Sequence, residues 1–392
     1  MSSKRVKSID SLRGFSLLGI LLANLLIFQY GMIGKDHVTG LSWIDKGAYY
    51  ITKVLIESSF MPIFTLLFGY SLIKLIESIR NKGRKSRWVI VRRAIGLILL
   101  GLLHATYLWE GDILLFYGLT MFFLFIFINR KAKTLMIWSG VFFILSTALM
   151  YGPLNDLTEK EQTKYDAYVE QEHKVYENGS YLEVYDFRNN AIPPYYDDPI
   201  ELLFVLLLSP FVYAPLFLAG MAFAKMNVFE NIRAEQKLYK YGSYLVPLAI
   251  VCKIMGQFTS NWEGVLGNAG GQLLALGYVF LFMRVLTSGK FAKFIYAFEQ
   301  VGKLSLTNYL VQSVICTTIF YGYGFGMFGK MGVFAAMIMG IIIYALQCVI
   351  SIQYFKKWKR GPVEMLLRMW TNFSLSGRLK EKKGMVQRGE AS

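Results

Sequence analysis

Residues 9-IDSLRGFSLLGILLANLLIFQY-30 contain the clearest structural signal in this sequence. From Leu12 onward the segment is almost continuously apolar, and it has about the 20 residues that a helix needs to cross the hydrocarbon of a bilayer. Asp10 and Arg13 stand at its start, and Asn24 lies inside it. An ionisable group inside a membrane costs about 3 kcal/mol or more, so it is kept mainly where it has a function. The segment therefore predicts a membrane-spanning helix with a polar site at one end.

The composition of the whole chain supports the same class. The 392 residues are 55% hydrophobic and only 17% charged, whereas soluble proteins carry about 25% charged residues. We therefore expect an all-α polytopic membrane helix bundle with about ten transmembrane helices. The ten apolar ranges are 12–30, 51–76, 94–108, 113–128, 134–151, 202–224, 241–258, 268–287, 304–320 and 331–355.

The charges predict the orientation of the bundle. The chain has 42 Lys and Arg residues, most of them in loops on one side, while most of the 26 acidic residues fall on the other. This bias predicts that the basic side, with both termini, faces the cytoplasm. The basic hairpin 80-RNKGRKSRWVIVRR-93 carries the strongest bias. Because the net charge of +16 is concentrated on one face, it indicates anionic lipid headgroups rather than nucleic acid as partners.

The spans divide into two groups of five, separated by one long polar segment. The predicted regions are 1–152 with five spans, an acidic loop outside the membrane at 153–201, 202–355 with five more spans, and a basic tail at 356–392. We expect a helix at about 158–178 in the loop, which then forms a partly ordered lid over the outer face. The tail begins KKWKRGPVEMLLRMWT, which predicts a short amphipathic helix on the inner leaflet.

The segment 101-GLLHATYLWEGDILLFYG-118 is the best candidate for a catalytic group. The turn between the third and fourth spans is short, so His104, Trp109, Glu110 and Asp112 are expected to lie close together. An imidazole with a carboxylate neighbour can act as a general base, because the carboxylate fixes the tautomer and stabilises the imidazolium. The alternative is a hydrogen bond between helices that caps one of them.

Asp10 and Arg13 form a second candidate site. They are three residues apart and can pair on a helix, and Arg13 and Asn24 lie eleven residues, or three turns, apart on one face. Alternatively, Asp10 is an N-cap and Arg13 an interfacial anchor.

The ninth span supplies a third candidate, in 302-GKLSLTNYLVQS-313. Asn308 and Gln312 are four residues apart, so they face one way and could bind a polar group of a substrate. The alternative is that they only hold neighbouring helices together. In the second span, Pro62 predicts a kink that opens a cavity.

Two isolated residues complete the candidates. His37 lies in the first outer loop, where a solvated side chain is the alternative to a substrate contact. Lys253, inside the seventh span, is expected to reach Glu263 or to extend outward. We find neither a metal-ligand spacing nor a nucleotide-binding or soluble hydrolase motif.

Three segments in order resemble the YeiB-like family of bacterial inner-membrane proteins. They are 9-IDSLRGFSLLGILLAN-24, 104-HATYLWEGDILLFYG-118, and 302-GKLSLTNYLVQS-313 followed by 360-RGPVEMLLR-368. The resemblance extends from residue 5 to about residue 371, with the long outer loop matching least.

The first helix also resembles that of the transmembrane acyltransferases, including the heparan-glucosaminide acetyltransferases and the O-acyltransferases of bacterial polysaccharides. In the latter, an Arg and a His on the first helix are catalytic. Arg13 matches that Arg, but Asn24 stands where the His belongs and cannot take a proton from a hydroxyl. The resemblance thus implies a base from elsewhere, His104 with Asp112 or Glu110 orienting it, with His37 as the rival because the glucosaminide enzymes place a His in that loop.

These observations lead us to expect an acyltransferase. Acyl-CoA or acetyl-CoA would dock at the cytoplasmic face, with Arg13 and the 80–93 hairpin meeting its phosphates. The acceptor would be a hydroxyl or amine of an envelope sugar or lipid, and Asn24 or Asn308 would polarise the thioester carbonyl. The alternatives are a transporter or flippase for an envelope metabolite or lipid, and an inactive scaffold.

Overall fold

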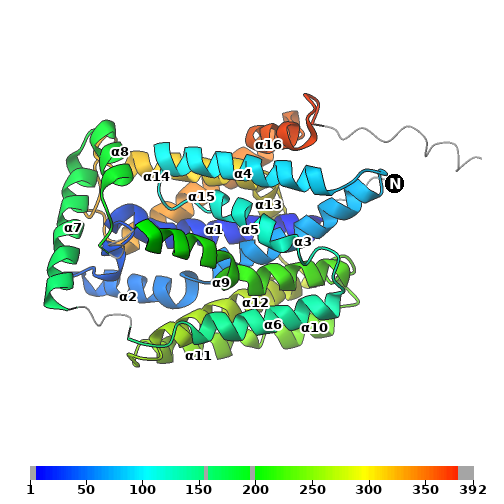
Figure 1. Ribbon diagram of the computed structural model, residues 1–392, viewed down its shortest axis with the longest axis horizontal. Helices are drawn as coiled ribbons and strands as arrows, with labels where there is room; N and C mark the ends of the chain where they lie inside the picture. The colour runs from blue at the N-terminus through cyan, green and yellow to red at the C-terminus, as the bar shows by residue number, and fades with distance from the viewer. Residues whose placement is uncertain (1–5, 154–157, 195–198, 378–392) are drawn as a thin grey trace, which may run out of the picture.

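In the computed structural model, which describes residues 6–153, 158–194 and 199–377, all regular secondary structure is helical (Figure 1). The α-helices are α1 (Lys7–Tyr30), α2 (Trp43–Ile51), α3 (Phe60–Arg80), α4 (Arg87–Tyr107), α5 (Leu114–Leu124), α6 (Ala132–Ala148), α7 (Glu159–Asn178), α8 (Tyr181–Asn190), α9 (Pro199–Lys225), α10 (Gln236–Gly242), α11 (Leu245–Gly256), α12 (Glu263–Ser288), α13 (Ala292–Lys303), α14 (Ser305–Phe320), α15 (Val333–Lys357) and α16 (Pro362–Asn372). A 3₁₀ turn, Gly34–Asp36, precedes α2, and a π-helical turn, Thr52–Ile56, follows it.

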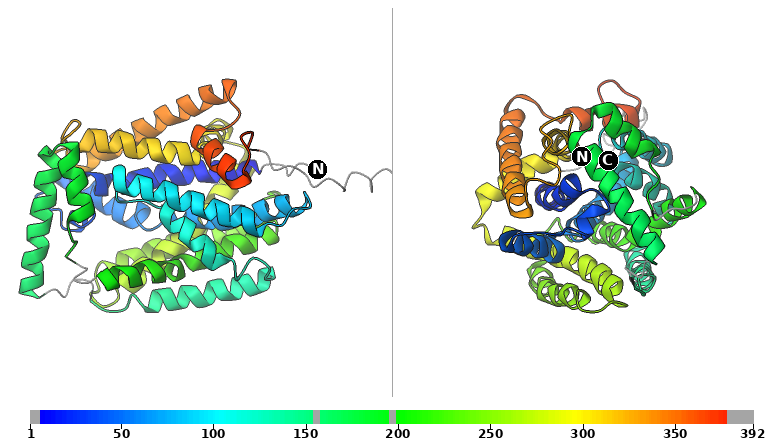
Figure 2. Two further views of the ribbon diagram at one scale, coloured as in Figure 1. Left: turned by 45° about the horizontal axis from the view of Figure 1, so that its top comes forward. Right: turned by 90° about the vertical axis from the view of Figure 1, so that its left-hand side faces the viewer.

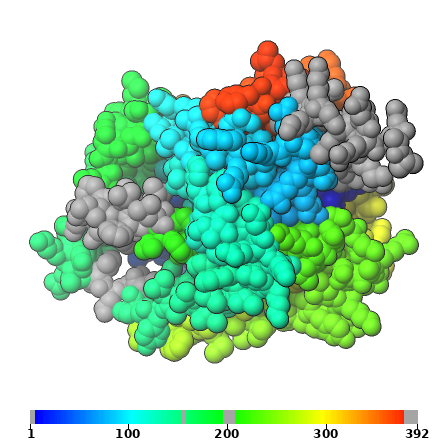
Figure 3. Space-filling view, turned by 45° about the vertical axis from the view of Figure 1, so that its right-hand side comes forward, coloured from blue at the N-terminus to red at the C-terminus, as the bar shows by residue number. Residues whose placement is uncertain are grey.

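The long helices run along one axis and define two ends (Figures 1 and 2). The beginning of α1 and the last described helix, α16, lie near one end, which we call the basic end because the loop between α3 and α4 is there. Helices α7 and α8 stand across the opposite end, which we call the lid end (Figure 1). In Figure 3, α4 to α6 (cyan to teal) cross the front of the molecule between α16 (red) and the green to yellow α9–α12.

The outward faces of the long helices are apolar, as a bilayer requires. Large exposed side chains on α4, α6 and α15 include Leu99, Leu102, Leu103, Ile137, Ile144, Leu145, Ile341, Ile342, Leu346 and Ile350. Six described segments are long and apolar enough to cross a membrane: Lys7–Tyr30, Trp43–Arg80, Arg87–Tyr107, Leu208–Lys225, Glu263–Ser288 and Val333–Lys357. The polytopic helical class is confirmed. All ten predicted ranges contain helix, but α5, α6, α11 and α14 have fewer than 18 residues.

Helix α1 lies inside the bundle, where glycines let its neighbours approach closely. It packs against α3, α13, α14 and α15. A Cβ on Gly302 of α13 would lie 1.8 Å from the Asp10 carbonyl oxygen, and one on Gly14 would lie 2.0 Å from the Phe298 carbonyl oxygen. Small residues at such crossings are typical of membrane helices. This packing places the polar start of α1 in the protein interior.

The second predicted span is broken, although not by the expected proline. The break follows the π-helical turn, with Ser58 in the left-handed region at φ 57°. Pro62 lies in the first turn of α3, where its missing N–H costs no helical hydrogen bond. Lys253 Nζ donates to the freed Glu57 carbonyl oxygen at 2.6 Å. The predicted partner of Lys253, Glu263, is therefore wrong.

Two capped helices form the predicted lid. A Thr158–Glu161 capping box starts α7 and a Ser180–Glu183 capping box starts α8, so each pair satisfies backbone groups at its helix start. The Gly322 N–H donates to the carbonyl oxygen of Tyr176 at 2.7 Å, which ties α7 to the loop after α14. The helix predicted at about 158–178 is confirmed.

Candidate functional site

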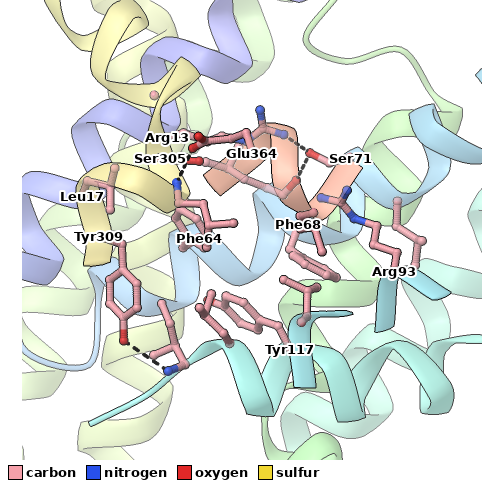
Figure 4. A pocket seen from close by; sticks show the side chains of 18 of the residues that line it. Arg13, Leu17, Phe64, Phe68, Ser71, Arg93, Tyr117, Ser305, Tyr309 and Glu364 are labelled. Carbon is pink, nitrogen blue, oxygen red and sulfur yellow. Dashed lines mark hydrogen bonds between the residues drawn. The ribbon is translucent and has the colours of Figure 1, made fainter. Parts of the chain in front are cut away.

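A cavity of about 250 Å³ opens inside the basic half of the bundle (Figure 4). Its walls are largely apolar and aromatic, and its polar groups come from α1, α3, α4, α5, α13, the start of α14 and α16. The lining includes Arg13, Leu17, Phe64, Phe68, Ser71, Arg93, Leu97, Ile113, Tyr117, Lys303, Ser305, Tyr309 and Glu364. In Figure 4, Arg13, Ser71 and Arg93 lie toward one side of the cavity and Tyr309 toward the other. The cavity is thus amphipathic, with cations at one side.

The cations of the cavity differ in whether a carboxylate pairs with them. Arg13 Nη1 lies 2.9 Å from Asp10 Oδ1, the pair that the sequence spacing predicted, and Arg13 also donates to the Ser71 hydroxyl. Lys303 Nζ lies 2.6 Å from Glu299 Oε1. Half-buried Arg93, in contrast, forms no ion pair or hydrogen bond through its guanidinium to any part of the chain that the structure describes. A cation held in this way favours an anionic ligand.

The one carboxylate among the described residues that line the cavity already accepts hydrogen bonds from the protein. Glu364 of α16 accepts hydrogen bonds from the backbone N–H groups of Leu306 and Thr307 at 2.8 and 3.1 Å, and from the Thr307 hydroxyl at 2.6 Å. It therefore caps the N-terminus of α14, where a negative charge is stabilised. Glu364 does not neutralise Arg93.

Tyr309 closes the inner end of the cavity. Its hydroxyl accepts from the Ile113 N–H at 3.3 Å and donates to the Gly111 carbonyl oxygen at 3.2 Å. The ring of His104 lies behind it, with 5.2 Å between ring centroids. His104 is thus one aromatic layer away from the cavity.

His104 stands at the centre of a buried hydrogen-bond chain. Its Nδ1 lies 2.8 Å from Asp112 Oδ1, and its Nε2 lies 2.9 Å from the Ser313 hydroxyl. Asp112 is fixed in turn, because its Oδ2 accepts from the Leu115 N–H at 2.7 Å. His104 is 4% exposed and Ser313 1%. With Nδ1–H donating to the carboxylate, Nε2 is free to accept the Ser313 proton, which is the arrangement of a nucleophile, a base and an orienting acid.

Sequence reasoning found two members of this chain and missed the third. The predicted contact of His104 with Asp112 is present, whereas Glu110 does not contact His104 and points into another cluster. Ser313 was not among the candidates, although it ends the segment 302–313. Only the packing of α14 beside α4 brings it to His104, which is 209 residues away.

A second polar group, the lid cluster, lies beyond His104. Each of its members has a buried side-chain atom without a hydrogen-bond partner among the described residues. They are Gln29 (Oε1), Trp109 (Nε1), Glu110 (Oε2), Glu172 (Oε2) and Arg188 (Nε). Trp109 stacks on Phe28 at 4.1 Å between centroids and meets the His104 ring edge-to-face at 6.3 Å.

The lid cluster contains two carboxyl groups whose pKa values are raised. Burial, and then the charge of Glu110, raises the pKa of Glu172 to about 8. Burial likewise raises the pKa of Glu110, whose Oε1 accepts from the Tyr176 hydroxyl at 3.2 Å. Arg188 donates to the Leu108 and Thr106 carbonyl oxygens, both at 2.9 Å, and so ties α8 to the end of α4. The cluster can hold protons or polar groups under the lid.

Four predicted site residues lie outside the cavity, the His104 chain and the lid cluster. Asn24 is half-buried, three turns or about 16 Å along α1 from Arg13. Asn308 donates to Ser351, and Gln312 to Gln347, so these amides link α14 and α15 as the alternative interpretation proposed. His37 is exposed at the lid end against Tyr165. None of the four lines this cavity, and the donor or substrate contacts predicted for them stay predictions.

No group of three or more His, Cys, Asp or Glu side chains that could hold a metal ion occurs within residues 6–153, 158–194 and 199–377. The polar groups described above are Arg93, the His104 chain and the lid cluster.

Sequence comparisons place this arrangement among related bacterial proteins. Residues 223–374 match the family described as "Protein of unknown function (DUF418)". The chain is 29% identical to the uncharacterized protein YxaH of Bacillus subtilis (strain 168), with 98% of each chain covered. It is 26% identical to the uncharacterized protein YeiB of Escherichia coli (strain K12), over 94% of this chain and 96% of that one. These matches confirm the resemblance to the YeiB-like family that the three motifs indicated.

Proposed function

We propose that this protein is a transmembrane acyltransferase that moves an acyl group from acyl-CoA or acetyl-CoA to a hydroxyl or amine of a cell-envelope sugar or lipid. The observation that carries the proposal is the Asp112–His104–Ser313 chain, which lies one aromatic ring behind a cavity that contains Arg93, an arginine with no ion-pair partner among the described residues. A buried base at the end of an anion-binding cavity suits the transfer of a group that arrives on a phosphorylated carrier.

Each part of the cavity has a role in this proposal. Arg93, together with Arg13 and Lys303, binds the phosphates of the donor at the basic end, which the charge bias predicts to be cytoplasmic. A cavity of about 250 Å³ is too small for a whole CoA and suits only its thioester-bearing arm, with the nucleotide outside. The apolar walls around Phe64 and Tyr117 hold the acyl group. His104 then acts as the base that Asn24 cannot be.

Transport of an envelope metabolite or lipid is the second candidate. It is favoured by the contact of the His104 ring with both Tyr309, which ends the cavity, and Trp109, which begins the lid cluster. In that case the same polar groups line a path and no bond is broken.

Thermal unfolding in detergent, with and without CoA, acetyl-CoA and longer acyl-CoAs, separates the two. A ligand present at 100 times its Kd stabilises the folded state by about 2.7 kcal/mol. We expect such a shift for the wild type and its loss in Arg93→Gln. We also expect His104→Gln to keep the shift and to lose the release of CoA in the presence of envelope extract.

The control is Lys290→Gln, which removes an exposed charge from the turn after α12. Absence of a shift with every acyl-CoA would contradict the acyltransferase and favour transport. Full transfer by a folded His104→Gln would contradict the assignment of the base.

A further inference from the structure

The reactive nitrogen of His104 already has a hydroxyl group beside it. Nδ1 forms a hydrogen bond with Asp112 at 2.8 Å, so Nε2 is the atom that accepts a proton. Ser313 Oγ lies 2.9 Å from Nε2. The other hydrogen bond of Ser313, to the Tyr309 carbonyl oxygen of its own helix, is long at 3.4 Å. The first hydroxyl that His104 can deprotonate is therefore that of Ser313.

We infer that Ser313 is the nucleophile of this protein and carries the acyl group as a serine ester between two half-reactions. The inference rests on the proposed function and adds a covalent intermediate to it.

The first half-reaction consumes the donor. Ser313 Oγ attacks the thioester carbonyl carbon while its proton passes to His104 Nε2. The carbon–sulfur bond then breaks, and the leaving thiolate takes the proton from His104, so that free CoA departs and the serine ester remains. Asp112 holds the imidazole in the required tautomer and stabilises the imidazolium.

The second half-reaction restores the enzyme. The acceptor hydroxyl or amine attacks the ester carbonyl carbon as His104 Nε2 takes its proton. The bond from carbon to Ser313 Oγ breaks, and the oxygen regains the proton from His104. The sum of the two steps is acyl transfer, with no oxidant or reductant required.

The position of Ser313 explains why an intermediate is useful. Ser313 lies one turn beyond Tyr309 on α14, between the cavity and the lid cluster. A donor that enters at the basic end and an acceptor that enters under the lid then use one base in turn and never share a site. Trp109 Nε1 is a buried donor with no acceptor among the described residues, beside His104, and is the group available for the oxyanion.

Access requires one local movement. The Tyr309 hydroxyl is held by two long hydrogen bonds, 3.2 Å to Gly111 and 3.3 Å to Ile113. Breaking these two bonds releases the ring that separates the cavity from His104.

An alkyl fluorophosphonate tests the nucleophile without knowledge of the natural donor, because it phosphonylates a serine activated by a base. We expect labelling of the purified full-length protein at Ser313, found by peptide mass spectrometry. Labelling should be lost in Ser313→Ala and His104→Gln and kept in Thr318→Ala, which removes a hydroxyl of the same helix that bonds to its own backbone. Absence of labelling at Ser313 in the folded wild type would overturn the inference.

Transfer assays separate this inference from the proposed function. With acyl-CoA and no acceptor, we expect a burst of CoA equal to the amount of protein and an acyl adduct on Ser313. Ser313→Ala should lose the burst and at least ~10³-fold of the transfer rate, while Ser313→Cys should form a thioester instead. If Ser313→Ala transfers at the wild-type rate and His104→Gln does not, the base is right and the serine ester is wrong. If no acyl-CoA reacts with the wild type, the proposed function fails, and the labelling result alone decides whether Ser313 is nucleophilic.

Discussion

The basic-end cavity and the lid cluster are built in opposite ways. Long helices that touch at glycines form the cavity, which has open volume and a cation, Arg93, with no partner in the part of the chain that the structure describes. Two helices that begin with capping boxes, α7 and α8, cover the lid cluster, which holds five buried atoms without partners among the described residues. His104 contacts a ring from each region. The difference indicates a rigid, preformed site for an anion on one side and a removable cover on the other.

The largest effect on stability should come from disturbing the glycine contact between α1 and α13, which forms part of the cavity wall. Gly302→Ala places a Cβ 1.8 Å from the Asp10 carbonyl oxygen, so α1 and α13 must separate. We expect a loss of about 3 kcal/mol or more in unfolding free energy, seen as a lower melting temperature or as loss of monodisperse protein in detergent. Gly140→Ala, where a Cβ meets no atom within 4 Å, is the control and should be nearly neutral. Equal melting temperatures for both variants would show that the cavity wall is not rigid.

The next largest effect on stability concerns the lid cluster, and it is seen in how the stability depends on pH. The pKa of Glu172 is raised to about 8 in the folded protein, so between its ordinary value near 4.5 and pH 8 the folded state keeps a proton that the unfolded chain has lost. The contribution of this group to the free energy of unfolding is therefore fully present below pH 4.5 and is lost as the pH rises to 8. We expect the wild type to lose on the order of 3 kcal/mol between pH 5 and pH 8 from this source.

Glu172→Gln should flatten that slope, because Gln has no proton to lose. Glu170→Gln, exposed on the same helix, should keep it. Melting temperatures measured at pH 5, 6.5 and 8 give the comparison. An unchanged slope in Glu172→Gln would mean that the buried carboxylate does not govern the stability of the lid.

The two regions also differ in how far the sequence predicts them. The helical class and the polar start of α1 follow from local patterns, since the length of an apolar run and a three-residue spacing are visible directly. The contact of His104 with Asp112 follows from a short turn between two spans. These are relationships within a few residues, and the structure contains each of them.

The remaining features depend on contacts between distant segments. Ser313 reaches His104 only through helix packing, and Glu172 reaches Glu110 only because the lid folds back over the bundle. Arg93 stands in a basic hairpin where any single charge is explained by membrane orientation. The break at Ser58, which redirects Lys253, has no local signal as strong as Pro62. No periodicity distinguishes these residues from their neighbours.

A smaller effect on stability is expected from removing the hydrogen bonds that hold the lid on the bundle. Arg188→Ala removes two hydrogen bonds, to the Leu108 and Thr106 carbonyl oxygens, that hold α8 on the end of α4. We expect a local loss of about 2 kcal/mol, visible as faster hydrogen exchange in residues 159–190 and unchanged exchange in 302–313. Lys174→Ala, an exposed site on α7, is the control. Faster exchange in both segments would show that cavity and lid form one cooperative unit.

The smallest effect on stability, and the sharpest contrast between the regions, should come from Arg93→Gln. Because Arg93 has no partner among the described residues and has Arg13 and Arg368 as electrostatic neighbours, removing its charge relieves repulsion and breaks no ion pair. We expect the ligand-free variant to match the wild type or to gain less than about 1 kcal/mol. Inorganic phosphate or sulfate should raise the melting temperature of the wild type and of Lys290→Gln but not of Arg93→Gln. A clear loss of stability without any anion would mean that Arg93 stabilises the fold itself. The cavity would then resemble the lid cluster, because its own side chains would close it and no ligand would be needed.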